Sequence, residues 1–293
     1  MRNRLGWMVL FVCLSAPIGA LAQGRPIGLN DRAGGRDHAI ELELDVSIAS
    51  EDGPGAATYT TLLPKVYGSF GLTDDLELEV TIPSVFVDYS RDEGNEVPFG
   101  ESDSALLLGN PYLALFYADR SLRSVARVGF GVALPVLDPD DPIGREAPLM
   151  AVATRGYMDT WLYVPERLSF VVPGQLQARV SLFVIGVDAA VSALIPTGDS
   201  DQQETELGVQ AGALFGIAAG DATIGMRLQV GAVPTIDSGD HAQASLMPFV
   251  QADLDGGAFF HGGVLINLDD PYGVAGDNTV GLWALRIGGG GRF

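Results

Sequence analysis

The feature that most limits the fold of this chain is an alternation of apolar and charged side chains with a period of two residues. It is cleanest in AIELELDVSIA at residues 39–49, and it returns in LELEVTI at 76–82 and IGMRLQV at 224–230. Side chains of one parity share a face of a β-strand, so each run has one hydrocarbon face and one polar face. No helical period accounts for these runs, which therefore predict β-strands.

Turn residues between such runs divide the chain into twelve strands, an even number as in bacterial single-chain barrels. The connections alternate between short and long, as periplasmic turns and extracellular loops do. The sequence thus predicts an all-β fold: a transmembrane antiparallel up-and-down β-barrel with short periplasmic turns, longer extracellular loops and both termini in the periplasm. We predict the strands at 39–50, 58–71, 75–90, 103–118, 123–137, 166–180, 184–197, 205–218, 222–234, 243–254, 257–268 and 279–293.

The N-terminus has the features of a cleaved export signal. Arg2 and Arg4 precede a mostly apolar stretch, and Ala20-Leu21-Ala22 forms a small-x-small cleavage site. We therefore expect a signal peptide at 1–22, a periplasmic segment at 23–38 and the barrel at 39–293. After residue 22 no apolar run reaches the roughly 18 residues of a membrane-spanning helix, so an exported chain of this composition is predicted to lie in the cell outer membrane as a barrel.

The chain ends on IGGGGRF at residues 287–293, where the alternation continues through the glycines into a closing strand. The terminal Phe293 resembles the assembly signal of bacterial outer-membrane β-barrel proteins, which the insertion machinery reads. The resemblance implies two partners, the barrel-assembly machinery and outer-membrane lipid.

Three short phrases carry a narrower resemblance: YGSFGLTDDLELE at 67–79, GNPYLAL at 109–115 and LIPTGD at 194–199. They are similar to phrases of outer-membrane channels that include the family associated with meta-pathway phenol degradation. The resemblance implies uptake of small solutes, including aromatic or hydrophobic ones, and it brings no catalytic residues.

Projecting the polar parity of each strand into the barrel gives a nearly balanced set of lumen charges, concentrated toward the periplasmic half. One interpretation is a constriction whose charges select solutes. The other is an ion-pair network that fills a narrow barrel. The candidate pore-lining residues are Glu41, Glu43, Asp45, Lys65, Glu77, Glu79, Arg127, Arg179, Asp188, Arg227, Asp253, His261 and Arg286, together with Arg292.

The connection from Leu137 to Arg167 is the longest, and connections of this length are often functional. Leu149–Arg155 is predicted to form a short helix, and the loop over 138–165 is a candidate gate that folds over or into the mouth. Tyr157, Trp161 and Tyr163 then contact a solute, or else Trp161 and Tyr163 belong to the outer aromatic belt, which we favour because such belts are common.

Other functions are weighed against a passive channel for small solutes. A net charge of -20 argues against nucleic-acid binding. The acidic stretches Asp138–Asp141 and Asp199–Glu206 lack a calcium-loop spacing, so we expect no metal or cofactor. His38, His241 and His261 show no evident Ser/His/acid constellation, so we predict no enzyme. The alternatives kept are a barrel enzyme of the lipid-hydrolase type, a closed structural barrel and a soluble exported β-protein.

Overall fold

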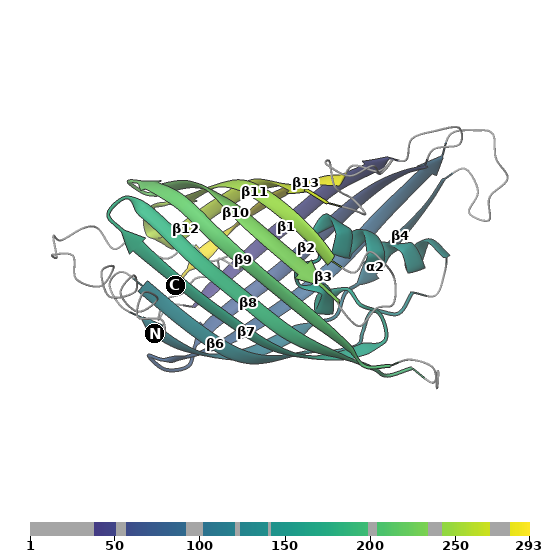
Figure 1. The fold of residues 1–293 in the computed structure, drawn as a ribbon, viewed down its shortest axis with the longest axis horizontal. Helices are drawn as coiled ribbons and strands as arrows, with labels where there is room; N and C mark the ends of the chain where they lie inside the picture. The colour runs from purple at the N-terminus through teal and green to yellow at the C-terminus, as the bar shows by residue number, and fades with distance from the viewer. Residues whose placement is uncertain are drawn as a thin grey trace, which may run out of the picture.

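The strands close into one antiparallel barrel in the computed structural model, which describes residues 38–50, 57–91, 102–120, 124–139, 142–198, 204–233, 242–269 and 282–293. Strands that follow one another in the chain pair with each other, except that β4 and β5 both pair with β3, and β1 pairs with β13 to close the barrel (Figure 1). The strands are β1 (Ala39–Ser50), β2 (Ala57–Gly71), β3 (Leu76–Arg91), β4 (Ser102–Leu108), β5 (Tyr112–Arg120), β6 (Ser124–Ala133), β7 (Arg167–Val180), β8 (Phe183–Pro196), β9 (Glu206–Ala219), β10 (Ala222–Ala232), β11 (Ala242–Asp253), β12 (Ala258–Asn267) and β13 (Leu282–Arg292).

Two of these strands, β4 and β5, lie end to end along β3. Ser84 on β3 faces Leu108 on β4, and Thr81 on β3 faces Tyr112 on β5. The predicted single strand over 103–118 is therefore interrupted at Gly109-Asn110-Pro111, and the barrel has twelve strands as predicted. Pro111 has no N–H to donate to a ladder, which favours a break at this point.

The connections alternate in length, as the sequence predicts. One end of the barrel, here called the turn end, carries tight connections such as 181–182 and 220–221. The opposite end, here called the loop end, carries the long connections. Phe293 lies at the turn end, where its N–H and C=O exchange 2.9 Å hydrogen bonds with His38 (Figure 1). The predicted signal peptide at 1–22 lies outside the described residues.

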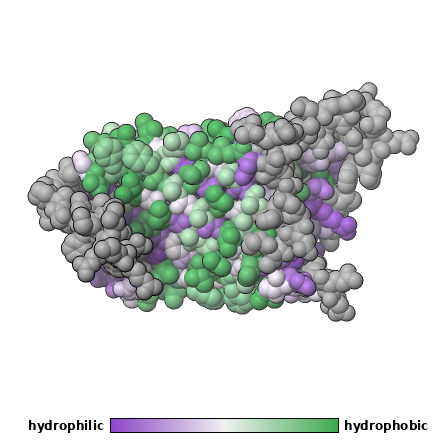
Figure 2. All heavy atoms as spheres, in the orientation of Figure 1, coloured by the Kyte–Doolittle hydropathy of each residue, from purple (hydrophilic) through white to green (hydrophobic). Residues whose placement is uncertain are grey.

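The outer wall of the barrel is apolar. Leu42, Leu106 and Ile224 are 64%, 71% and 67% exposed, and hydrophobic side chains cover much of the barrel in Figure 2. Among the described residues, no helix is long and apolar enough to cross a membrane. The alternation thus turns hydrocarbon outward and polar groups inward, which is the arrangement of a barrel embedded in lipid.

Candidate functional site

The central feature of the interior is a segment of the longest connection that folds into the barrel. It spans residues 142–164 and is called the inward segment: helix α2 (Pro142–Thr154), a turn, and the short helix η1 (Thr160–Leu162). Figure 1 shows α2 within the loop end, beside β3 and β4. The sequence predicts a helix at Leu149–Arg155. In the structure α2 begins earlier, at Pro142, continues through Pro148 and ends one residue before the predicted end, at Thr154. The loop folds into the mouth of the barrel, as predicted, and its action as a gate is a proposal.

One side of the inward segment is held by apolar packing. Ile143, Ala147 and Met150 of α2 belong to a buried cluster with side chains of β2 and β3 such as Leu63 and Val85. Burial of aliphatic side chains is the main favourable term in such packing. This face fixes α2 against one wall of the barrel.

The two aromatic residues near the end of the segment lie inside the barrel. Trp161 is 5% exposed and Tyr163 is 0% exposed, and the ring of Trp161 lies 6.0 Å from that of Tyr112 on β5. The favoured prediction that both belong to an outer aromatic belt was wrong. The reason is that β7 begins only at Arg167, so the chain before it returns from the lumen rather than along the wall. Burial raises the pKa of the Tyr163 phenol.

Asn110, at the break between β4 and β5, ties this end of the segment to the wall. Its side-chain N–H groups donate to the carbonyls of Trp161 at 3.1 Å and Val164 at 2.6 Å. Its carbonyl oxygen accepts hydrogen bonds from the N–H groups of Val136 and Leu137, both at 3.0 Å. Asn110 is fully buried, and its side chain uses its donor and acceptor groups at the same time. It therefore joins its own backbone to the stretches at 136–137 and 161–164.

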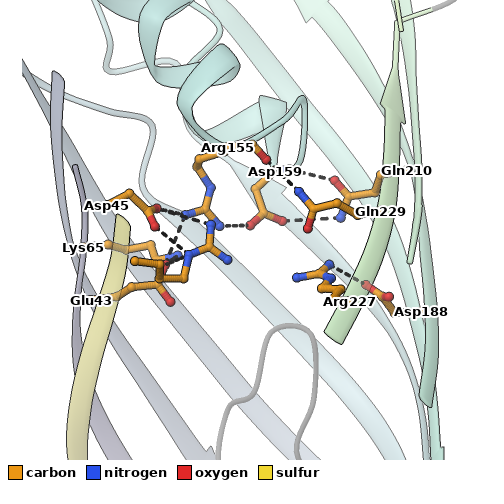
Figure 3. Close-up of polar contacts among 10 residues, drawn as sticks. Glu43, Asp45, Lys65, Arg155, Asp159, Asp188, Gln210, Arg227 and Gln229 are labelled. Carbon is orange, nitrogen blue, oxygen red and sulfur yellow. Dashed lines mark hydrogen bonds and ion pairs between the residues drawn. The ribbon is translucent and has the colours of Figure 1, made fainter. Parts of the chain in front are cut away.

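Arg155, directly after α2, is the main polar anchor. Its guanidinium contacts Asp45, lies 3.1 Å from Glu43 and lies 2.7 Å from Asp159 in the following turn (Figure 3). Burial alone would lower the pKa of Arg155, but Asp45, Asp159 and Glu43 together raise it well above its usual value. The guanidinium therefore stays charged and joins the segment to β1.

Further hydrogen bonds reach strands on other parts of the wall. The side chain of Gln210 on β9 accepts from the Asp159 N–H at 2.7 Å, and Gln229 on β10 donates to the Arg155 carbonyl at 3.0 Å (Figure 3). Asn267 on β12 donates to the Ala153 carbonyl at 3.1 Å. The segment thus contacts strands around the barrel, from β1 through β3 and from β9 to β12, and crosses the lumen.

The turn that carries Asp159 has an unusual backbone. Gly156, Tyr157 and Asp159 have φ values of 62°, 62° and 55°, in the left-handed region. Glycine and aspartate tolerate this region, but for a bulky residue such as tyrosine it is strained. Such strain persists only where the surrounding contacts hold it, which is consistent with the Arg155 and Gln210 bonds on either side.

The predicted lumen charges other than Arg179 form ion pairs in the barrel interior. Arg127 contacts Glu79 and lies 2.9 Å from Glu77. The other pairs are Lys65 with Glu43 at 2.5 Å, Arg286 with Asp45 at 2.6 Å, Arg227 with Asp188 at 3.4 Å, His261 with Glu41 at 2.8 Å and Arg292 with Asp253 at 2.5 Å. Arg179 lies at the turn end, where it donates to the Ser181 carbonyl at 3.3 Å. The structure thus shows ion pairing and leaves solute selection to be tested.

A cavity of about 30 Å³ remains between η1 and the wall. Each enclosed water needs roughly 10–15 Å³ of such space, so it holds about two waters and no organic solute. Its lining mixes aromatic and charged side chains, among them Tyr112, Phe116, Trp161, Glu79, Arg127 and Asp188.

Sequence reasoning missed the residues that hold the inward segment. The sequence places Asn110 only within the predicted strand 103–118, and Arg155 only at the end of a predicted helix. A signal for Arg155 exists, because a lone arginine follows the apolar run LMAVA at 149–153 and stands four residues before Asp159. Gln210 and Gln229 share the lumen parity of their strands, but they are uncharged and so are not among the candidate lumen charges.

Comparisons with known proteins address the fold. No protein-family model matches the chain, and no curated protein matches it. Among solved structures, an outer membrane channel from Pseudomonas putida F1 superposes with a TM-score of 0.57, covering 94% of this chain and 100% of that chain at 11% identity. The chain has the fold of an outer-membrane β-barrel. The translocator domain of the autotransporter NalP from Neisseria meningitidis gives a TM-score of 0.52, covering 89% and 90% at 10% identity. Two neighbours with such different names share architecture, which does not by itself assign a function.

Proposed function

We propose that this chain is a passive outer-membrane channel for small solutes and that the inward segment is its gate. The observation that carries the proposal is the ring of charged and amide side chains around that segment. Buried ion pairs are often no more stabilising than apolar residues of the same size. A purely structural barrel would therefore gain little from so many ionisable groups, whereas a conduction path uses them to choose and orient solutes.

The fold supports a channel in a second way. The Pseudomonas putida protein, named as an outer membrane channel, is covered over its whole length. The cavity itself is too small for an organic solute, but Tyr112 and Phe116 on β5 belong to its lining, and an aromatic wall favours solutes with an apolar, including aromatic, body. We propose that such solutes pass when the inward segment moves away from the wall.

A reversible disulfide tests the gate. The hydroxyl oxygens of Ser47 on β1 and Thr154 at the end of α2 lie 2.6 Å apart. Because a C–S bond is longer than a C–O bond, two sulfur atoms on the same Cβ atoms come within reach of the roughly 2.05 Å of an S–S bond. The chain has one cysteine, Cys13, in the predicted signal peptide, so Ser47→Cys with Thr154→Cys introduces the only pair in the refolded mature chain. We expect small single-channel conductance when the pair is oxidised and wild-type conductance after reduction.

The controls are the two single-cysteine variants, which should not respond to reductant. Equal conductance of the double variant before and after reduction, with the cross-link verified by mass spectrometry, would reject the inward segment as the gate. A folded wild type that passes no current under any condition would instead support a closed structural barrel.

Selectivity tests the charged lining. Arg127→Ala with Arg227→Ala removes the cations that face Glu79 and Asp188, while Glu77 keeps only its ion pair with Arg120. We therefore expect the reversal potential in a salt gradient to move toward cation selectivity. An unchanged reversal potential would place these charges outside the conduction path.

The remaining assignments are proposals of the same kind. We propose that Phe293, which is 68% exposed at the turn end, is read by the barrel-assembly machinery, and that this end faces the periplasm. We propose no catalytic activity. Fatty-acid release from phospholipid by the wild type and its loss in His261→Asn would favour the hydrolase alternative.

A further inference from the structure

The seam where the barrel closes holds an unusual cluster of side chains. Strand β13 lies between β12 and β1, and Gly288 on β13 faces both His261 on β12 and Glu43 on β1. A Cβ atom on Gly288 would lie only 2.3 Å from Nε2 of His261. The missing side chain therefore leaves the space through which the imidazole crosses β13 and reaches Oε1 of Glu41 on β1, at 2.8 Å.

Glu41 is left with unused binding capacity. The residue is 4% exposed, and its second oxygen, Oε2, is buried without a hydrogen-bond partner among the described residues. A buried carboxylate oxygen in this state costs free energy. Its neighbour Glu43 differs, because Lys65, Arg155 and Arg286 all approach that carboxylate, each through Oε1. Glu41 therefore carries the negative charge in this cluster that is least compensated by arginine or lysine.

We propose that Glu41, Glu43 and His261 form a binding site for a divalent transition-metal ion, with zinc as the best-fitting ion. One ligand atom from each residue lies within 4.8 Å of the other two. Two atoms that are each 2.0–2.2 Å from one zinc ion lie at most about 4.4 Å apart, so small side-chain rotations close the site. One imidazole nitrogen with two carboxylates is a zinc donor set, whereas calcium and magnesium prefer oxygen alone.

Such an ion would join β1 to β12 across the closing strand. It would use Oε2 of Glu41 and leave Oε1 of Glu43 to its lysine and arginine partners. The proposed site differs from the sequence-based prediction that no metal binds. The sequence does not reveal it because residues 41, 43 and 261 meet only when the barrel closes. It does not depend on conduction, so its test is independent of the channel proposal.

The test is zinc titration of the refolded mature chain in detergent after removal of metal with EDTA, followed by calorimetry. We expect one zinc ion per wild-type chain, with calcium and magnesium unable to compete. Glu41→Gln and His261→Asn each keep a polar side chain of similar size and should weaken zinc binding by more than tenfold. His38→Asn, which removes a histidine at the turn end, is the matched control and should bind zinc like the wild type.

Gly288→Ala separates the geometry of the site from its ligands. All three ligands remain, but the added methyl group displaces the imidazole, so zinc affinity should fall. Saturating zinc should also raise the unfolding temperature of the wild type and not that of His261→Asn, since a ligand that binds only the folded state stabilises it. Absence of zinc binding in the wild type, or equal binding in Glu41→Gln and His261→Asn, would overturn the proposal and assign any bound zinc to acidic surface residues.

Discussion

Arg155→Ala is the substitution that most directly tests how the inward segment is held. Without the guanidinium, Asp45 keeps Arg286 at 2.6 Å and Glu43 keeps Lys65 at 2.5 Å, but Asp159 loses its ion pair with Arg155. Removing one partner of a buried ion pair costs about 3–5 kcal/mol. The barrel strands keep their ladders, so we expect this cost to fall on the inward-held state.

The expected effect on conduction follows from that energy. Every 1.4 kcal/mol changes an equilibrium constant about tenfold, so a loss of about 3 kcal/mol shifts the balance between held and released segment by roughly a hundredfold. In single-channel recordings Arg155→Ala should therefore open far more often than the wild type. Protease added to the detergent-solubilised protein should also cleave the segment sooner.

Arg145→Ala is the matched control, because Arg145 lies on the same helix but is exposed. It should behave like the wild type in both assays. If folded, heat-modifiable Arg155→Ala shows the open probability and protease resistance of Arg145→Ala, the ion pairs of Arg155 do not hold the segment and the reasoning fails.

Three further predictions concern other contacts. Asn110→Ala leaves four backbone groups, at Val136, Leu137, Trp161 and Val164, without their side-chain partner and should lower the unfolding temperature; an unchanged temperature would show that water replaces the lost hydrogen bonds. Gly231→Ala places a Cβ 2.1 Å from the Tyr157 carbonyl oxygen and should raise conductance, whereas Gly291→Ala, with open space around it, should not; equal conductance would contradict this. Phe293→Ala should slow insertion by the assembly machinery in reconstituted membranes without changing refolding in detergent, and equal insertion rates would argue against the signal.

The barrel could be predicted from the sequence because its pattern is local. Which face of a strand a side chain takes depends on a period of two residues, so runs such as AIELELDVSIA place Glu41, Glu43 and Asp45 on one face without knowledge of the rest of the chain. Turn residues and connection lengths gave the strand count in the same way. The break at Gly109-Asn110-Pro111 was not predicted because continuous apolar runs, ALLL at 105–108 and YLALFY at 112–117, lie on both sides of it.

The contents of the lumen could not be predicted because they depend on contacts between distant residues. Arg155 meets Asp45 across 110 positions, and His261 meets Glu41 across 220. The sequence does not show whether Trp161 and Tyr163 face lipid or the lumen. Only the path of the chain into the barrel decides which of the two they face. By itself, therefore, the sequence determined the strands, their faces and the closed barrel, since these follow from local periodicity. The tertiary structure alone decided which charges meet, where the long connection lies and that Gly288 leaves space for the His261 side chain, since these follow from strand register around a closed barrel.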